Sequence, residues 1–235
     1  MIIASNFKTN HNRKSTKEFI EYIDAQNYFS EIRIFPPFTA LNSFDLPPNI
    51  KVGVQDFYPV QNGSFTGEIG FEQLEEFDVQ SVLVGHSERR HVLGESQETT
   101  VSKYNYAKQK ECEIIYCVGE PKEVREQGIE AVMAYIWEQF DGIDIDYDEL
   151  IVAYEPVWAI GTGLSASKDD IKEVLEHLRA KIKAPLLYGG SVKVETTQEI
   201  LSIENCDGVL VGTASWKVEN FSKMVEIADN KKEEK

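Results

Sequence analysis

Eight short apolar segments recur along the 235-residue chain, and this repetition limits its possible folds more than any other feature. Most of the segments are continuously apolar rather than alternating, as is typical of parallel strands that are covered on both faces. They comprise residues 2–7, 32–35, 52–55, 81–85, 114–117, 150–154, 186–188 and 208–211. The pattern therefore predicts eight β-strands buried in a parallel sheet.

Amphipathic stretches separate these segments and predict helices between the strands. Residues 168–183 place five apolar side chains on one helical stripe, namely Ile171, Val174, Leu175, Leu178 and Ile182. Three pairs have the hydroxyl and acid spacing of a helix start: Ser15 with Glu18, Ser167 with Asp170, and Thr196 with Glu199. Eight alternations of strand and helix predict an α/β protein, a single-domain (β/α)8 TIM barrel with a closed parallel sheet. Periodicity alone leaves a doubly wound open sheet as the alternative.

The chain is expected to form one domain over residues 1–235, with 229–235 as a charged, frayed tail. No apolar run reaches the ~18 residues of a membrane helix. The N-terminus lacks the basic region of a signal peptide. Three cysteines, Cys112, Cys117 and Cys206, do not make a disulfide framework and fit a reducing compartment. We therefore expect a cytoplasmic protein without a membrane segment.

The charge balance limits the possible partners. The chain has 24 Lys and Arg against 40 Asp and Glu, which gives a formal net charge of −16. A field of this sign repels phosphates, so nucleic acids and anionic membranes are not expected as partners. Any anionic ligand must therefore be held by a local positive site.

Polar and glycine-rich residues follow several of the predicted strands, where a barrel carries its chemistry. Asn6 and Lys8 end the first strand, although a lone lysine there is usually a solvated charge. His86 follows the fourth strand and fits a catalytic or a structural role equally well. A hydrolase elbow is excluded because Arg89 stands where the second glycine would be. A zinc site through His86 and His91 is not supported, since paired cysteines are missing.

Glu155 ends the sixth apolar segment, where a carboxylate is unfavourable to bury unless it has a function or a partner. An apolar, aromatic loop, residues 156–163, follows it and has the composition of a lid that excludes water. The alternative is a tight structural turn. Residues 161–166 also match G-x-G-x-x-A, but a dinucleotide site would need the first glycine directly after the strand.

Glycine-rich segments follow the seventh and eighth predicted strands, at 189–191 and 212–213. In barrels of this class, such loops present backbone N–H groups to a phosphate. Ser191, Gly212 and Thr213 are thus candidate phosphate contacts.

Seven motifs together resemble the triosephosphate isomerase family and cover almost the whole chain. They are NFK at 6–8, GSFTGE at 63–68, VGHSERR at 84–90, CVGE at 117–120, AYEPVWAIGTG at 153–163, YGGSV at 188–192 and DGVLVG at 207–212. The resemblance implies interconversion of dihydroxyacetone phosphate and D-glyceraldehyde 3-phosphate through an enediolate, in glycolysis and gluconeogenesis. No cofactor and no metal are implied.

The resemblance also assigns roles. Glu155 matches the general base and His86 the neutral electrophile that polarises the carbonyl, as described for this family. Lys8 matches the cation that faces the phosphate and the enediolate, with Asn6 beside it, and Glu88 is expected to hold Lys8 or a neighbour. The backbone N–H groups of Gly161, Ser191, Gly212 and Thr213 match the phosphate contacts. Residues 156–163 match the lid.

The resemblance further implies a homodimer through the loop 61–68, whose apolar Phe65 is unfavourable to leave in water. Phe65 folded back onto its own barrel is the alternative. The tip is expected to bring Thr66 near Asn6 and Lys8 of a partner subunit.

The sequence departs from the family in several places. Thr213 replaces a glycine and would be strained at a positive φ. Leu164, Ser165 and Ala166 replace a lid hinge that often contains lysine, Phe7 replaces a common tryptophan, and the chain is shorter than many members.

Two rival functions remain. Another phosphosugar isomerase or an aldolase on the same barrel is disfavoured, because Glu155 rather than a Schiff-base lysine ends the sixth strand. A binding protein that has lost catalysis is disfavoured by the joint presence of Lys8, His86 and Glu155.

Overall fold

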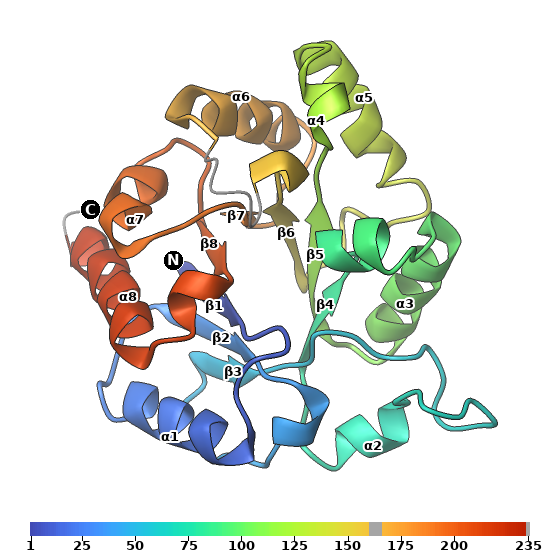
Figure 1. Ribbon diagram of the computed structural model, residues 1–235, viewed down its shortest axis with the longest axis vertical. Coiled ribbons are helices and arrows are strands. Elements are labelled where there is room, and N and C mark those ends of the chain that lie inside the picture. Colours follow the sequence, from blue (N-terminus) through green and yellow to red (C-terminus); the bar gives the residue numbers. More distant parts are fainter. Residues whose placement is uncertain (160–165, 234–235) are drawn as a thin grey trace.

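Eight parallel strands alternate with helices around one sheet in the computed structural model, which describes residues 1–159 and 166–233 (Figure 1). The strands are β1 (Ile2–Asn6), β2 (Glu31–Phe35), β3 (Ile50–Val52), β4 (Ser81–Val84), β5 (Glu113–Val118), β6 (Leu150–Tyr154), β7 (Leu186–Tyr188) and β8 (Gly208–Val211). The α-helices are α1 (Arg13–Asp24), α2 (Phe71–Glu75), α3 (Gln97–Gln109), α4 (Lys122–Arg125), α5 (Ile129–Glu138), α6 (Lys168–Arg179), α7 (Val194–Leu201) and α8 (Val218–Glu233). Shorter turns of helix are η1 (Phe38–Ala40), η2 (Glu88–Val92), η3 (Val157–Ala159) and η4 (Thr213–Ser215).

The sheet closes on itself, so the barrel prediction is confirmed and the open-sheet alternative is wrong. Hydrogen-bonded ladders follow the order β3-β2-β1-β8-β7-β6-β5-β4. The two ends of this series meet through Val54, just beyond β3. Its amide donates to the Ser81 carbonyl at 3.0 Å, and its carbonyl accepts from the Leu83 amide at 2.9 Å. One bridge therefore completes the ring at the β3–β4 seam.

Apolar side chains form two separate cores. The inner core fills the barrel and contains Ala4, Phe35, Leu83, Ile115 and Leu210. The outer core lies between the strands and the surrounding helices, for example at Ile3, Ile114 and Val152. Adjacent strand residues thus point to opposite cores, which explains why the strands are apolar throughout rather than alternating.

A charged cluster lies at the amino-terminal end of the barrel interior, below the inner core. Arg33 of β2 binds Glu113 of β5 through two hydrogen bonds of 2.6 and 2.8 Å. Glu113 also accepts hydrogen bonds from Ser81 of β4 at 2.9 Å and from Lys51 of β3 at 3.0 Å. One carboxylate therefore joins four strands, including both strands of the seam.

The helix starts agree only partly with the expected pairs. Ser167 and Asp170 form the predicted capping box of α6. The other two predictions are wrong by three residues, because Asn12 is the N-cap of α1 and Lys193 is the N-cap of α7. Ser15 and Thr196 instead stand at the third position of their helices, where their side chains bond back to the cap.

Other boundaries shift by a few residues. β3 spans Ile50–Val52 rather than 52–55. Beyond Val52 the pairing is reduced to an isolated bridge between Val54 and Val82 of β4, so residues 53–55 are not part of the strand. α8 continues through Glu233 and covers most of the segment expected to be a frayed tail. Among the described residues, no helix is both long enough and apolar enough to cross a membrane.

The charged cluster generates a stability prediction. Replacing Glu113 by alanine should lower the free energy of unfolding by about 3–5 kcal/mol, since it removes the buried carboxylate of Arg33 and leaves the guanidinium with the more exposed Glu31 at 3.2 Å. Urea denaturation measures the change. Glu18→Ala is the matched control, because the ion pair of Glu18 among the described residues is the exposed one with Lys14 at 3.7 Å, and its loss should change stability by about 0.5 kcal/mol or less. Equal effects of the two substitutions would contradict the assignment.

Candidate active site

Five strands deliver the predicted site residues to one end of the barrel. Asn6, Lys8, His86, Glu155, Ser191, Gly212 and Thr213 all line a single cavity of about 370 Å³. Asn6 ends β1, and the others follow β1, β4, β6, β7 and β8. Because all strands are parallel, their carboxyl ends share one rim, and residues far apart in sequence meet there.

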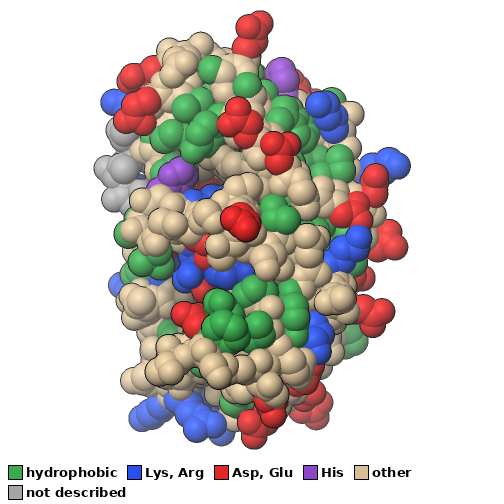
Figure 2. Space-filling model, turned by 90° about the vertical axis from the view of Figure 1, so that its right-hand side faces the viewer, with side chains coloured by type: hydrophobic (Ala, Val, Ile, Leu, Met, Phe, Trp, Pro, Cys, Tyr) green, Lys and Arg blue, Asp and Glu red, His purple; other side chains and the backbone are tan. Residues whose placement is uncertain are grey.

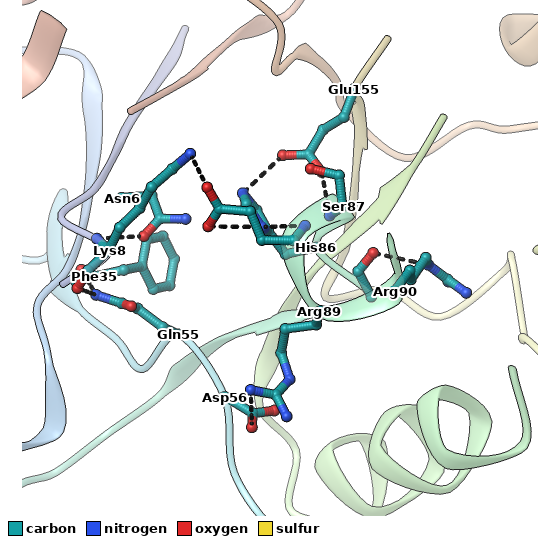
Figure 3. A network of polar contacts seen from close by, with 12 residues as sticks. Asn6, Lys8, Phe35, Gln55, Asp56, His86, Ser87, Arg89, Arg90 and Glu155 are labelled. Carbon is teal, nitrogen blue, oxygen red and sulfur yellow. Dashed lines mark hydrogen bonds and ion pairs between the residues drawn. The ribbon is translucent and has the colours of Figure 1, made fainter. Parts of the chain in front are cut away.

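Glu155 is the best-anchored member of the site. Its side chain is buried, with 2% exposure. One carboxylate oxygen, Oε1, lies 3.1 Å from His86 Nε2, and the other, Oε2, accepts a hydrogen bond from the Ser87 amide at 2.8 Å (Figure 3). Both oxygens are thus held by groups from the segment after β4.

These contacts fix the charge state of the Glu155 carboxylate. Burial alone would raise its pKa, since water no longer solvates the anion. The interactions with His86, the Ser87 amide and Lys8 act in the opposite direction and together lower the pKa below its ordinary value. Glu155 is therefore a carboxylate at neutral pH, although it is buried.

Glycines on both neighbouring strands make room for Glu155. A Cβ atom on Gly119, after β5, would lie 1.8 Å from the Glu155 carbonyl oxygen. A Cβ atom on Gly189, after β7, would lie 2.8 Å from Glu155 Cγ. The backbone and side chain of Glu155 can take this position only because both neighbours lack a side chain.

The two ring nitrogens of His86 face different groups: Nδ1 faces the Glu88 amide, and Nε2 faces Glu155. The Glu88 amide donates to Nδ1 at 3.3 Å, so Nδ1 is an acceptor and carries no proton. The proton then resides on Nε2, which faces Glu155 and the cavity. Gly85, at φ 74°, makes the turn that brings His86 off the strand. His86 can therefore act as a hydrogen-bond donor to a ligand.

Lys8 has a strained backbone, with φ 51°. The Asn6 side chain accepts from the Lys8 amide at 2.9 Å, and Gln55 donates to the Lys8 carbonyl at 2.9 Å. The Lys8 ammonium lies 2.6 Å from Glu88 Oε1, which confirms the expected contact. A Cβ atom on Gly212 would lie 3.2 Å from Lys8 Cε, so the ammonium reaches across to β8. These contacts hold the cation on the cavity, between Glu88 and Gly212.

The expected phosphate contacts are brought together only in part. Ser191, Gly212 and Thr213 lie around the same cavity. Gly161 and residues 160–165 of the expected lid and hinge lie outside the described residues, as does most of the G-x-G-x-x-A match. Thr213 has no positive φ and begins η4, so the expected strain is absent and threonine fits this position.

The described start of the expected lid is anchored by a buried acid. Glu120, after β5, accepts hydrogen bonds from Trp158 Nε1 at 2.9 Å and from the Tyr154 hydroxyl at 3.1 Å. Burial raises the pKa of Glu120, although these hydrogen bonds oppose the shift. The aromatic loop thus begins on a fixed point beside Glu155.

Three supporting groups received no role from the sequence, although Gln55 and Glu120 belong to the polar residues that it places at strand ends. Gln55 holds the Lys8 backbone, the Ser87 amide holds Glu155, and Glu120 holds the start of the loop. Gln55 and Glu120 did follow apolar segments, which is the signal that could have identified them. Within the part of the chain that the structure describes, no group of three or more His, Cys, Asp or Glu is arranged to hold a metal ion.

Comparisons with known proteins point to one family. The model of a family described as triosephosphate isomerase matches residues 1–228. The triosephosphate isomerase of Sulfurimonas denitrificans is 51% identical over 234 residues, covering 98% of this chain and 97% of the relative. The triosephosphate isomerases of Nitratiruptor sp. and Wolinella succinogenes are 51% and 48% identical, over 97% and 96% of this chain and 98% and 99% of their own lengths.

The lowering of the Glu155 pKa by its contacts can be tested by titration. We expect ¹³C NMR of the Glu155 carboxylate, assigned with the Glu155→Gln variant, to give a pKa below the ordinary value of 4.5. His86→Ala should raise this pKa, because burial persists while a stabilising contact is lost. The Glu18 carboxylate serves as an exposed reference. A wild-type pKa above 4.5, or no response to His86→Ala, would contradict the assignment.

Proposed function

Since the chain belongs to the triosephosphate isomerase family, we propose that it interconverts dihydroxyacetone phosphate and D-glyceraldehyde 3-phosphate. The observation that carries the proposal is the convergence of the Glu155 carboxylate, His86 Nε2 and Lys8 on one cavity. A proton base, a hydrogen-bond donor and a cation are the three groups that a ketose–aldose isomerisation through an enediolate requires.

The reaction follows from the roles of these groups. Glu155 removes a proton from the carbon next to the carbonyl, while His86 Nε2–H donates a hydrogen bond to the carbonyl oxygen. The C–H electron pair moves into a carbon–carbon double bond, and the negative charge develops on oxygen beside His86 and Lys8. Glu155 then returns a proton to the adjacent carbon as the oxygens exchange a proton, so no atom is gained or lost. The Glu155 carboxylate must release His86 and the Ser87 amide to reach the substrate.

The phosphate end of the substrate is assigned to Ser191, Gly212 and Thr213, with Gly161 from the lid. Glycine at 212 allows a close approach of the backbone, and backbone N–H groups bind an oxyanion without adding a side chain. Lys8 lies beside Gly212 and supplies a positive charge between the phosphate and the reacting carbons. Residues 156–163, of which 160–163 lie outside the described residues, are assigned the role of the lid that excludes water from the enediolate.

The rival functions fit this site less well. A Schiff-base aldolase needs a lysine at the end of β6, where Glu155 stands. A binding protein without catalysis gives no reason to bury a carboxylate at 2% exposure between His86 and the Ser87 amide. The proposed reaction belongs to glycolysis and gluconeogenesis, and the three unpaired cysteines fit the reducing cytoplasm.

Assembly is proposed to be homodimeric, through the loop 61–68. The segment between β3 and α2 projects from the barrel in Figure 1. Phe65 packs on Tyr58 of its own chain, with ring centroids 4.4 Å apart, yet stays 42% exposed. The self-packing alternative thus accounts for only part of its surface.

We assign the receiving surface for this loop to a region beside the catalytic cavity. Lys8, Phe38, Gln55, Arg89 and Leu93 line a second cavity of about 310 Å³, and Val92 and Leu93 are exposed by 76% and 67%. Hydrophobic side chains are exposed near recessed charged ones on the side of the molecule that Figure 2 shows. A partner's loop in this cavity would cover Lys8 and support each active site from the other chain.

If Glu155 is the base, then replacing its carboxylate by an amide should severely lower turnover. Glu155→Gln should preserve the fold and substrate binding but lower kcat by about 10²–10⁴-fold, since the amide cannot accept the proton. A coupled assay on contamination-free protein measures the loss, with circular dichroism as the folding check. Glu18→Gln should keep wild-type turnover. Near-normal turnover of Glu155→Gln would refute the role of Glu155.

The assembly proposal predicts that dimerisation and activity fail together. Replacing Phe65 and Thr66 by serine and asparagine should yield monomers with much lower turnover, because the loop loses its apolar anchor. Light scattering and the coupled assay are read on the same samples. Phe29→Ser, which changes another exposed aromatic at 66% exposure, should leave the mass unchanged. A fully active monomer would refute the coupling, and a monomeric wild type at micromolar concentration would refute the assembly.

A further inference from the structure

Among the residues that line the catalytic cavity, Lys193 has received no role from the mechanism. It follows Ser191 and Val192 at the carboxyl end of β7 and lies on the cavity wall with Ser191, Gly212 and Thr213. Its side chain is exposed. It therefore stands at the end of the cavity that the phosphate is proposed to occupy.

The backbone of Lys193 is held by hydrogen bonds, whereas its side chain is exposed. Lys193 is the N-cap residue of α7, and its carbonyl accepts from the amides of Thr196 and Thr197 at 3.1 and 3.0 Å. Its amide bonds to the Thr196 hydroxyl at 3.0 Å. No ion pair of the Lys193 side chain is found within residues 1–159 and 166–233. An exposed positive charge is thus attached to a well-anchored point of the rim.

The charge balance of the cavity shows why a second cation matters. Lys8 contributes +1 and Glu155, on the same cavity, contributes −1. Glu88 lines the adjacent cavity but lies 2.6 Å from the Lys8 ammonium and adds another −1, which leaves −1 for the three groups. The substrate phosphate carries about −1.5 to −2 at pH 7. Backbone N–H groups orient this anion but add no net charge. Without Lys193, a site of formal charge −1 on a protein of charge −16 would have to attract a dianion.

We infer that Lys193 is a further substrate-binding residue, which attracts the phosphate dianion at the rim and guides it towards Lys8, Gly212 and Thr213. This inference rests on the proposed function, because it takes a triose phosphate as the ligand. Lys193 takes no part in the bond changes of the proposed reaction. Its contribution is to association and phosphate affinity, and the proton transfers by Glu155 do not depend on it.

The experiment compares Lys193→Gln, Lys193→Glu and Lys193→Arg with the wild type. Lys183 supplies the matched controls, Lys183→Gln and Lys183→Glu, because it is an exposed lysine before β7, at the opposite end of the barrel. The readouts are kcat and kcat/KM for D-glyceraldehyde 3-phosphate at increasing salt, and the Kd of inorganic phosphate from NMR shifts of the Gly212 and Thr213 amides.

At about 10 mM ionic strength, Lys193→Gln should lower kcat/KM roughly three- to tenfold while kcat stays within about twofold. Lys193→Glu should lower kcat/KM further, and Lys193→Arg should restore it. The differences should shrink towards none at about 0.5 M salt, because screening removes the attraction. The Kd of inorganic phosphate should rise in parallel, and the Lys183 variants should match the wild type.

Three results would overturn the inference. They are equal effects at positions 193 and 183, a loss that does not respond to salt, and a failure of Lys193→Arg to restore kcat/KM. A wild type that does not isomerise triose phosphates would refute the proposed function instead. The NMR titration with inorganic phosphate would then still decide whether Lys193 supports anion binding, since it requires no turnover.

Discussion

Closure of the parallel sheet at Val54 is the constraint on which the rest of the molecule depends. The strands β3 and β4 share no continuous ladder, and one bridge from Val54 joins them. The Glu113 carboxylate reinforces the same seam from inside the barrel, where it is bound by Lys51 of β3 and Ser81 of β4. With the ring closed, the carboxyl ends of all strands form one rim, and Lys8, His86 and Glu155 meet there.

The site is then defined by how it stabilises one buried anion. Taking a carboxylate out of water is unfavourable unless hydrogen bonds and nearby positive charge replace the solvent. His86 Nε2 and the Ser87 amide do this for Glu155, and Lys8 contributes from further away. These contacts are also reversible, since each can be exchanged for a substrate atom. The same arrangement therefore keeps the base ionised and leaves it available for proton transfer.

Much of the fold could be predicted from local sequence because each strand and helix has its own signal. Apolar runs identified all eight strands, and the bounds of β6, β7 and β8 were correct. Helix starts were harder: Ser15 and Thr196 lie three residues inside their helices, because Asn12 and Lys193 precede them as caps. A hydroxyl and acid pair can stand at more than one helical position, so the pattern alone does not fix the first turn.

The candidate site was predictable where a residue type is unusual for its place, as with Glu155 after an apolar strand. It was not predictable where contacts depend on packing between distant segments. Gln55 supports Lys8 from another strand, and no spacing rule connects positions 47 residues apart. The closure of the ring is of the same kind, since the pairing of Val54 with β4 follows from the whole barrel.

The central claim is that Glu155 moves a proton between adjacent carbons of a triose phosphate. Isomerisation of D-glyceraldehyde 3-phosphate in D₂O, followed by ¹H NMR, tests it most directly. The account predicts deuterium at the carbon that receives the proton in dihydroxyacetone phosphate, with both turnover and labelling lost together in Glu155→Gln. The claim would be contradicted if the wild type and Glu155→Gln both turned over rapidly in D₂O and both gave dihydroxyacetone phosphate without deuterium.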